Sequence, residues 1–63
     1  MKLTIRALRI NANMSRKELA EKLGKSPLTI HNWEKGKTIP DFESIKLIGE
    51  IFDFDIQNIK VGK

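Results

Sequence analysis

Apolar residues near the start of the chain recur at intervals of three and four positions, with polar residues between them. Ile5, Leu8 and Ala12 keep this spacing, which is that of one face of a helix. Thr4 stands where its hydroxyl can cap the first turn. The pattern therefore predicts a first helix over about residues 4–12.

A second helix is predicted after a short break. Ser15 and Glu18 form a capping box, in which the serine hydroxyl accepts from the amide of residue 18 while the glutamate carboxylate accepts from the amide of residue 15. Gly24 is expected to end this helix, because glycine readily adopts the left-handed conformation found at helix C-termini. The apolar stripe of the helix consists of Leu19, Ala20 and Leu23.

A third helix is predicted over about residues 27–35. Ser26 can cap it, and Pro27 falls in the first turn, where its missing N–H group is harmless. Gly36 is expected to terminate it. The residues predicted to face the core are Ile30 and Trp33.

A loop and a fourth helix are predicted next. Pro40 biases the residue before it toward an extended conformation, so the segment 37–40 is expected to be a loop. Asp41 is expected to cap a helix over about residues 42–52, on which the small Gly49 would let another helix approach closely. The face predicted to be buried consists of Phe42, Ile45, Ile48, Gly49 and Phe52. A final short turn, capped by Asp55, carries Ile56 and Ile59.

The length and composition fit a single small globular domain over residues 1–63, with a core of about 4–60. The 63 residues are too few for a multidomain enzyme, and a content of 40% hydrophobic and 32% charged residues is ordinary for a folded protein. There is no cysteine, so no disulfide or thiolate metal site is expected, which fits the reducing cytoplasm. Neither a signal peptide nor an apolar run of membrane-spanning length is present in the sequence.

The positive charge is concentrated in the first part of the chain. The net charge is +4, but residues 1–37 carry nine of the twelve Lys and Arg and three of the eight Asp and Glu, a balance of +6, which leaves −2 for residues 38–63. The basic part is a candidate surface for a polyanion. A basic protein that is merely soluble would show the same balance, so charge alone leaves both interpretations open.

The second and third predicted helices, joined by residues 24–26, fit the description of a helix-turn-helix. An ordinary helical hairpin has the same spacing. The wider segment ALRINANMSRKELAEKLGKSPLTIHNWEKGKTIP, however, resembles the Cro/repressor type of helix-turn-helix domain. The matching positions are Arg9, Ser15 through Leu23, Gly24, Ile30, the run Trp33-Glu34-x-Gly36-Lys37, and Pro40.

This resemblance covers about residues 5–60 and implies an all-α, lambda-repressor-like bundle of five helices. It implies a sequence-specific regulator of transcription, of phage or bacterial type, that binds double-stranded DNA without a cofactor. Three departures stand out: Gly49 where the family usually has Ala, Asp53 where it often has Gly, and Pro27-Leu28 where known members place Gln or other polar residues. We expect Asp53 to adopt a left-handed conformation that ends the fourth helix.

In this type of domain the outward face of the third helix enters the major groove. Asn32 can pair with adenine, Leu28 can press on a thymine methyl group, and Thr29 or His31 can reach a neighbouring base or phosphate. Pro27 stands at the start of this face and offers no hydrogen bond to a base. The alternative is that these side chains are simply solvated.

Phosphate contacts are expected around this helix, beginning with Arg16 at the first turn of the second helix. The other candidates for phosphate binding are Lys25, Ser26, Lys35 and Lys37. The resemblance also implies a partly buried ion pair between Arg9 and Glu34, the alternative being two unrelated surface charges. Glu34 has no companion carboxylate, nucleophile or metal-ligand set, so it is not a candidate catalytic acid.

The partners expected are double-stranded DNA and, mainly on DNA, a weakly bound second copy. A small apolar patch of Leu47, Ile51 and Val61 could serve that dimer, although in a short chain these residues could equally belong to the core. No metal, small-molecule ligand or membrane is expected. Two other functions stay open, an antitoxin-type module that binds a protein and an RNA-binding domain that uses the basic face.

Overall fold

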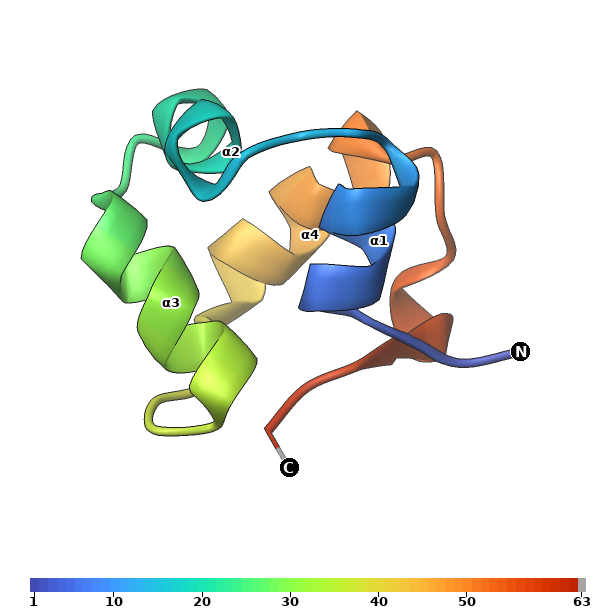
Figure 1. Cartoon of the computed structure of the whole chain (residues 1–63). Helices are drawn as coiled ribbons and strands as arrows, with labels where there is room; N and C mark the ends of the chain where they lie inside the picture. The colour runs from blue at the N-terminus through green and yellow to red at the C-terminus, as the bar shows by residue number, and fades with distance from the viewer. Residues whose placement is uncertain (63) are drawn as a thin grey trace.

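A computed structural model describes residues 1–62 as four α-helices closed by a short parallel strand pair. In chain order the elements are β1 (Leu3–Thr4), α1 (Ile5–Asn11), α2 (Arg16–Leu23), α3 (Pro27–Lys35), α4 (Phe42–Ile51), the 3-10 helix η1 (Ile56–Asn58) and β2 (Ile59–Lys60). The helices surround one core, with α2 and α3 at one side and α1 and α4 at the other (Figure 1). Lys63, the last residue of the predicted domain, lies outside the described residues.

Local signals place the helix ends where the sequence predicts them. The Thr4 hydroxyl accepts from the amide of Ala7 at 3.0 Å, and the capping box of Ser15 and Glu18 is formed in both directions. Asp53 has a φ of +50°, which confirms the left-handed residue expected after α4. These ends depend on hydrogen bonds between residues at most a few positions apart, so the local sequence is enough to specify them.

The core is built from one face of each helix and from β2. Its nine buried hydrophobic residues are Ile5, Leu8, Leu19, Ala20, Leu23, Ile30, Trp33, Ile48 and Ile59. Trp33 is 6% exposed, which confirms the prediction that it faces the core. Ala12 is exposed, so the first apolar stripe is one residue shorter than predicted.

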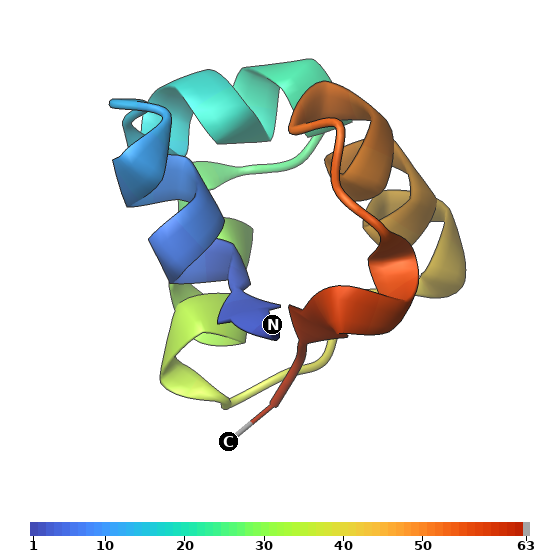
Figure 2. The same ribbon diagram turned by 90° about the vertical axis from the view of Figure 1, so that its right-hand side faces the viewer.

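The short turn predicted after Asp55 is confirmed, but among the described residues it is a 3-10 turn and not the fifth α-helix that the resemblance implies. The chain forms only the single 3-10 turn η1 after Asp55, whose carboxylate accepts from the amide of Gln57 at 2.9 Å. It then pairs as β2 with β1, in parallel register, so that Leu3 lies opposite Ile59 and Thr4 opposite Lys60. This pairing uses backbone groups that a longer helix would need. It also brings the two ends of the described chain side by side, as Figure 2 shows.

The buried face of α4 differs from the prediction at two positions. Phe42, the first residue of the helix, is 66% exposed, whereas Ser44 is 2% exposed. Ser44 can be buried because its hydroxyl donates to an Asp41 carboxylate oxygen at 2.7 Å, which satisfies the polar group. Asp41 does stand at the cap position, but its side chain makes this bond with Ser44 and none with a backbone amide of the helix.

Candidate nucleic-acid interface

The turn between α2 and α3 has the backbone that the helix-turn-helix hypothesis requires. Gly24 adopts the left-handed conformation with a φ of +68°, and the amides of Gly24 and Lys25 donate to carbonyl oxygens near the end of α2, at 3.3 and 2.9 Å. A residue with a Cβ would be strained at this φ. The turn therefore ends α2 sharply and lets α3 pack against it, as Figure 1 shows.

The start of α3 is fixed by a pair of hydroxyl groups. The Ser26 hydroxyl accepts from the amide of Thr29 at 3.2 Å and also lies 3.0 Å from the Thr29 hydroxyl. Both residues are predicted to contact DNA, and the structure also joins them to one another at the helix cap. The Ser26 hydroxyl can accept from the Thr29 amide and still donate its hydrogen to a phosphate, provided that the Thr29 hydroxyl is the donor in the bond between the two hydroxyl groups.

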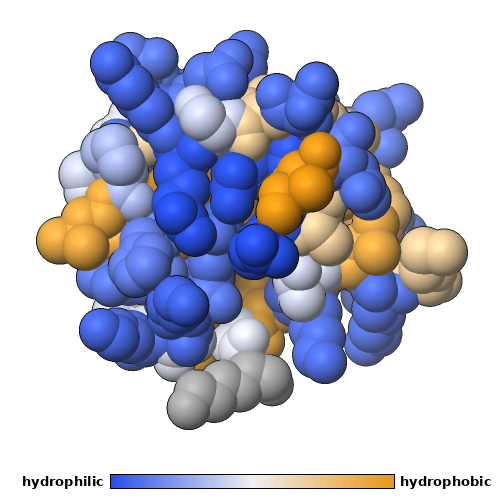
Figure 3. Space-filling view, in the orientation of Figure 1, coloured by the Kyte–Doolittle hydropathy of each residue, from blue (hydrophilic) through white to orange (hydrophobic). Residues whose placement is uncertain are grey.

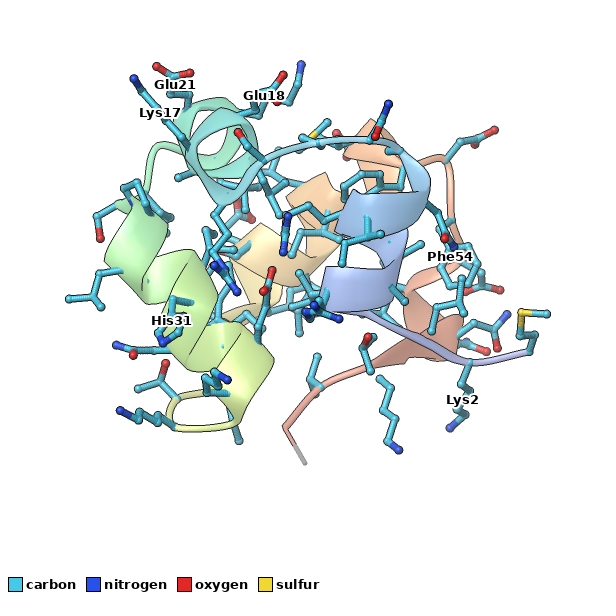
Figure 4. The ribbon with its side chains drawn as sticks, viewed as in Figure 1. Lys2, Lys17, Glu18, Glu21, His31 and Phe54 are labelled. Atoms are coloured by element: carbon cyan, nitrogen blue, oxygen red, sulfur yellow. The ribbon has the colours of Figure 1, made fainter. Side chains whose placement is uncertain are left out.

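The outer face of α3 presents the side chains predicted to read bases. Leu28 is 65% exposed, Pro27 and Lys35 are exposed, and Thr29, His31 and Asn32 are half-buried. Figure 4 places His31 on the middle of α3. Figure 3 shows this side of the molecule to be mainly hydrophilic, with isolated hydrophobic side chains. The polar side chains on such a helix face can form hydrogen bonds with base edges in the major groove of DNA.

Behind α3, Glu34 and Arg9 form a buried ion pair. The Arg9 Nε and Nη2 groups donate to Glu34 Oε2 and Oε1 at 2.7 and 3.2 Å, and its Nη1 donates to the Met14 carbonyl oxygen at 2.8 Å. The Glu34 side chain is 1% exposed and that of Arg9 10%. The pair therefore ties α3 to α1 and to the segment before α2, and the alternative of two unrelated surface charges does not hold.

Glu34 has a second partner that sequence reasoning missed. The Nε group of Arg16, on the first residue of α2, donates to Glu34 Oε1 at 3.0 Å. The contact joins residues 18 positions apart and depends on how α2 and α3 cross. Nothing in the local sequence pattern indicates this contact. Arg16 was expected to bind phosphate alone, and the structure adds a carboxylate partner.

These contacts set the ionisation of Glu34. Burial acts to raise the pKa of its carboxyl group, but the hydrogen bonds and positive charges of Arg9 and Arg16 outweigh burial and hold the pKa below its ordinary value. Glu34 is therefore a carboxylate at neutral pH, which fits an ion pair and not a general acid.

The lysines expected near phosphates are placed around the ends of α3. Lys25 Nζ lies 3.9 Å from an Asp41 carboxylate oxygen, and both side chains are substantially exposed, so this pair contributes little to stability. Lys35 and Lys37 are exposed, and within residues 1–62 neither takes part in an ion pair. Their charges are therefore available to an anion outside the protein.

The three residues of the predicted dimer patch are only partly exposed. Leu47 is 37% exposed, while Ile51 and Val61 are half-buried and pack against the core. Val61 lines a groove with Trp33 and Lys60 that neither Leu47 nor Ile51 lines. Among the described residues, the most exposed large hydrophobic side chains are those of Met1, Ile39, Phe42 and Leu28.

Residues 1–62 contain no group of three or more histidine or acidic side chains placed to hold a metal ion. No helix among them has both the length and the apolar character needed to cross a membrane.

Residues 5–59 match the helix-turn-helix family. The chain is also similar to the HTH-type transcriptional activator BcrR of Enterococcus faecalis, with 36% identity over 59 residues. That alignment covers 94% of this chain and 29% of the relative, so the chain spans less than a third of the relative's length. No solved structure matches the chain significantly.

Proposed function

The chain belongs to the helix-turn-helix family of DNA-binding transcription regulators, and we propose that it binds double-stranded DNA in a sequence-specific manner, with α3 in the major groove. The observation that carries this proposal is the outer face of α3, whose exposed and half-buried side chains stand on a helix anchored to α1 and α2 through Glu34. The fixed helix supplies the rigid placement that base contacts need.

Within this proposal, Asn32 pairs with an adenine and Leu28 contacts a thymine methyl group. Thr29 and His31 reach a neighbouring base or phosphate. Pro27 lies at the start of this face and makes no hydrogen bond to a base. The residues that bind phosphate are Arg16, Lys25, Ser26, Lys35 and Lys37. Concentration of positive charge in residues 1–37, which include α2, α3 and the turn between them, supports these assignments.

The regulator is proposed to be of bacterial or phage type and to act in the cytoplasm without a cofactor and without catalysing a reaction. Occupying an operator would change transcription by position relative to the polymerase. The relative from Enterococcus faecalis is described as an activator. For this chain we propose positional control, whose sign depends on where the operator lies.

We propose that two copies bind DNA together, with half-sites about one helical turn, ~34 Å, apart. Because the residues of the predicted patch are only partly exposed, we expect the free protein to be a monomer or a loose dimer. Analytical ultracentrifugation checks this, and a stable dimer at nanomolar concentration would contradict it.

The experiment that tests the function is selection of bound sequences from a pool of random DNA duplexes, followed by affinity measurements at physiological salt. We expect a defined sequence, and a palindrome would also report a dimer. Failure to bind any duplex would favour the protein-binding, antitoxin-type function. Preference for structured RNA over duplex DNA would favour the RNA-binding function.

A further inference from the structure

The carboxylate of Glu34 accepts hydrogen bonds from two arginines, which differ in how many of their nitrogens have a partner within the protein. Three nitrogens of Arg9 make hydrogen bonds within the protein, to Glu34 and to the Met14 carbonyl oxygen. Arg16 donates to Glu34 through Nε, and within residues 1–62 its two terminal nitrogens have no hydrogen-bond partner. Arg9 is therefore a structural arginine, whereas Arg16 keeps its terminal donors for another group.

The burial of the three side chains also separates the structural Arg9 from the more accessible Arg16. Glu34 and Arg9 are shielded from solvent, but the Arg16 side chain is 39% exposed. Two arginines and one carboxylate leave this cluster with one positive charge. Because Arg9 and Glu34 neutralise one another inside the protein, the remaining charge resides on the exposed guanidinium of Arg16.

We propose that Glu34 is a positioning residue for a phosphate contact, which it makes through Arg16. The bond to Nε fixes the plane of the guanidinium and directs its terminal nitrogens outward beside the first turn of α2. A fixed guanidinium offers a phosphate two parallel donors with little further loss of side-chain entropy. This inference rests on the proposed DNA-binding function, since the phosphate is that of the DNA backbone.

For the DNA affinity of Glu34→Gln, the proposal predicts the opposite of what a change in overall charge predicts. Glu34→Gln removes a negative charge from a DNA-binding surface, and a simple electrostatic argument expects tighter binding. If Glu34 acts by holding Arg16 in place, the same substitution weakens binding. Lysine at position 16 keeps the charge but has a single ammonium group, which cannot bind Glu34 through one nitrogen and phosphate through two others.

The main experiment measures binding of a fluorescently labelled duplex of random sequence by the full chain over a range of salt concentrations. We expect Arg16→Lys to bind about tenfold more weakly than the wild type, because a charge-assisted contact is lost. The slope of log affinity against log salt should also become smaller by about one unit. The matched control is Lys17→Arg, a swap at the neighbouring position that points away from the body of the protein in Figure 4 and should leave both quantities unchanged.

A second pair of variants tests Glu34 directly. Glu34→Gln should weaken binding and reduce the salt slope, while Glu21→Gln, which removes the same charge from the outer side of α2, should not weaken it (Figure 4). In the Arg16→Ala background, Glu34→Gln should produce no further loss. Circular dichroism and thermal melting of each variant show whether it is folded at the temperature of the binding measurement.

The outcomes separate this inference from the proposed function. If the wild type binds no duplex, the proposed DNA-binding function itself fails. If the wild type binds and Arg16→Lys binds equally well with the same salt slope, Glu34 does not act through Arg16 and the inference is overturned. Should Glu34→Gln fail to fold, Arg16→Lys still overturns the inference if it leaves the affinity and the salt slope unchanged, because it leaves the pair of Arg9 and Glu34 intact.

Discussion

Gly49 of α4 lies against Ile56 of η1 so closely that a Cβ atom at position 49 would be 2.6 Å from Ile56 Cγ2. The same Cβ would lie 3.0 Å from the Phe54 carbonyl oxygen, which belongs to the backbone. The sequence predicted that Gly49 permits a close approach, and the approaching segment is the 3-10 turn and not a fifth helix.

We therefore expect Gly49→Ala to destabilise the protein, although alanine is the residue that the family usually has here. Overpacking destabilises by about 1–3 kcal/mol, and the better helix propensity of alanine offsets about 1 kcal/mol of this. Denaturant unfolding would measure the difference. The double variant with Ile56→Ala, which removes the nearest atom, should recover part of the loss, and no recovery would place the strain elsewhere.

The ion pair of Arg9 and Glu34 should be strongly coupled, because both side chains are buried and joined by two hydrogen bonds. A double-mutant cycle of Arg9→Ala and Glu34→Ala is expected to give a coupling of roughly 1–3 kcal/mol in the free energy of unfolding. Strict additivity of the two substitutions would show that the pair contributes nothing beyond its separate side chains.

The lowered pKa of Glu34 makes stability depend on pH in the acid range. A carboxyl group whose pKa is lower in the folded than in the unfolded state stabilises the protein above its unfolded pKa, about 4.3, and this contribution is lost as the pH falls through the folded pKa. The melting temperature of the wild type should therefore fall as the pH drops below about 4. Glu34→Gln should show a smaller fall, and parallel pH profiles for the two proteins would contradict this origin.

The hydroxyl of Ser26 caps the helix that carries the proposed base contacts. Ser26→Ala should destabilise the protein by about 0.5–2 kcal/mol, because the amide of Thr29 loses its partner. Thermal melting monitored by circular dichroism would measure this. Ser26→Asn, which retains a capping oxygen, is the matched control and should stay close to the wild type.

Asn32 and Leu28 share the outer face of α3 and should set the base preference. Asn32→Ala is expected to cost about 1–3 kcal/mol on the selected DNA site and to relax the preference at one base pair, while binding to random DNA stays nearly unchanged. The comparison needs affinities for both kinds of duplex. An equal loss on the two would assign Asn32 to backbone contact or folding.

The sequence by itself determined the four α-helices, their ends and the turn between α2 and α3. Ser15, Ser26 and the left-handed Gly24 and Gly36 act on backbone groups within a few positions, so their effect can be predicted without knowing the fold. The family pattern likewise indicated the pair of Arg9 and Glu34 before any distance was known.

Only the tertiary structure decided the features that join distant parts of the chain. Ile59 and Lys60 become a strand because Leu3 and Thr4 lie beside them, which ends the helical turn that local signals begin. Arg16 reaches Glu34, 18 positions away, because of the way α2 crosses α3. In each case a contact made on folding outweighs the local preference, since buried polar groups and backbone amides are stable only when paired.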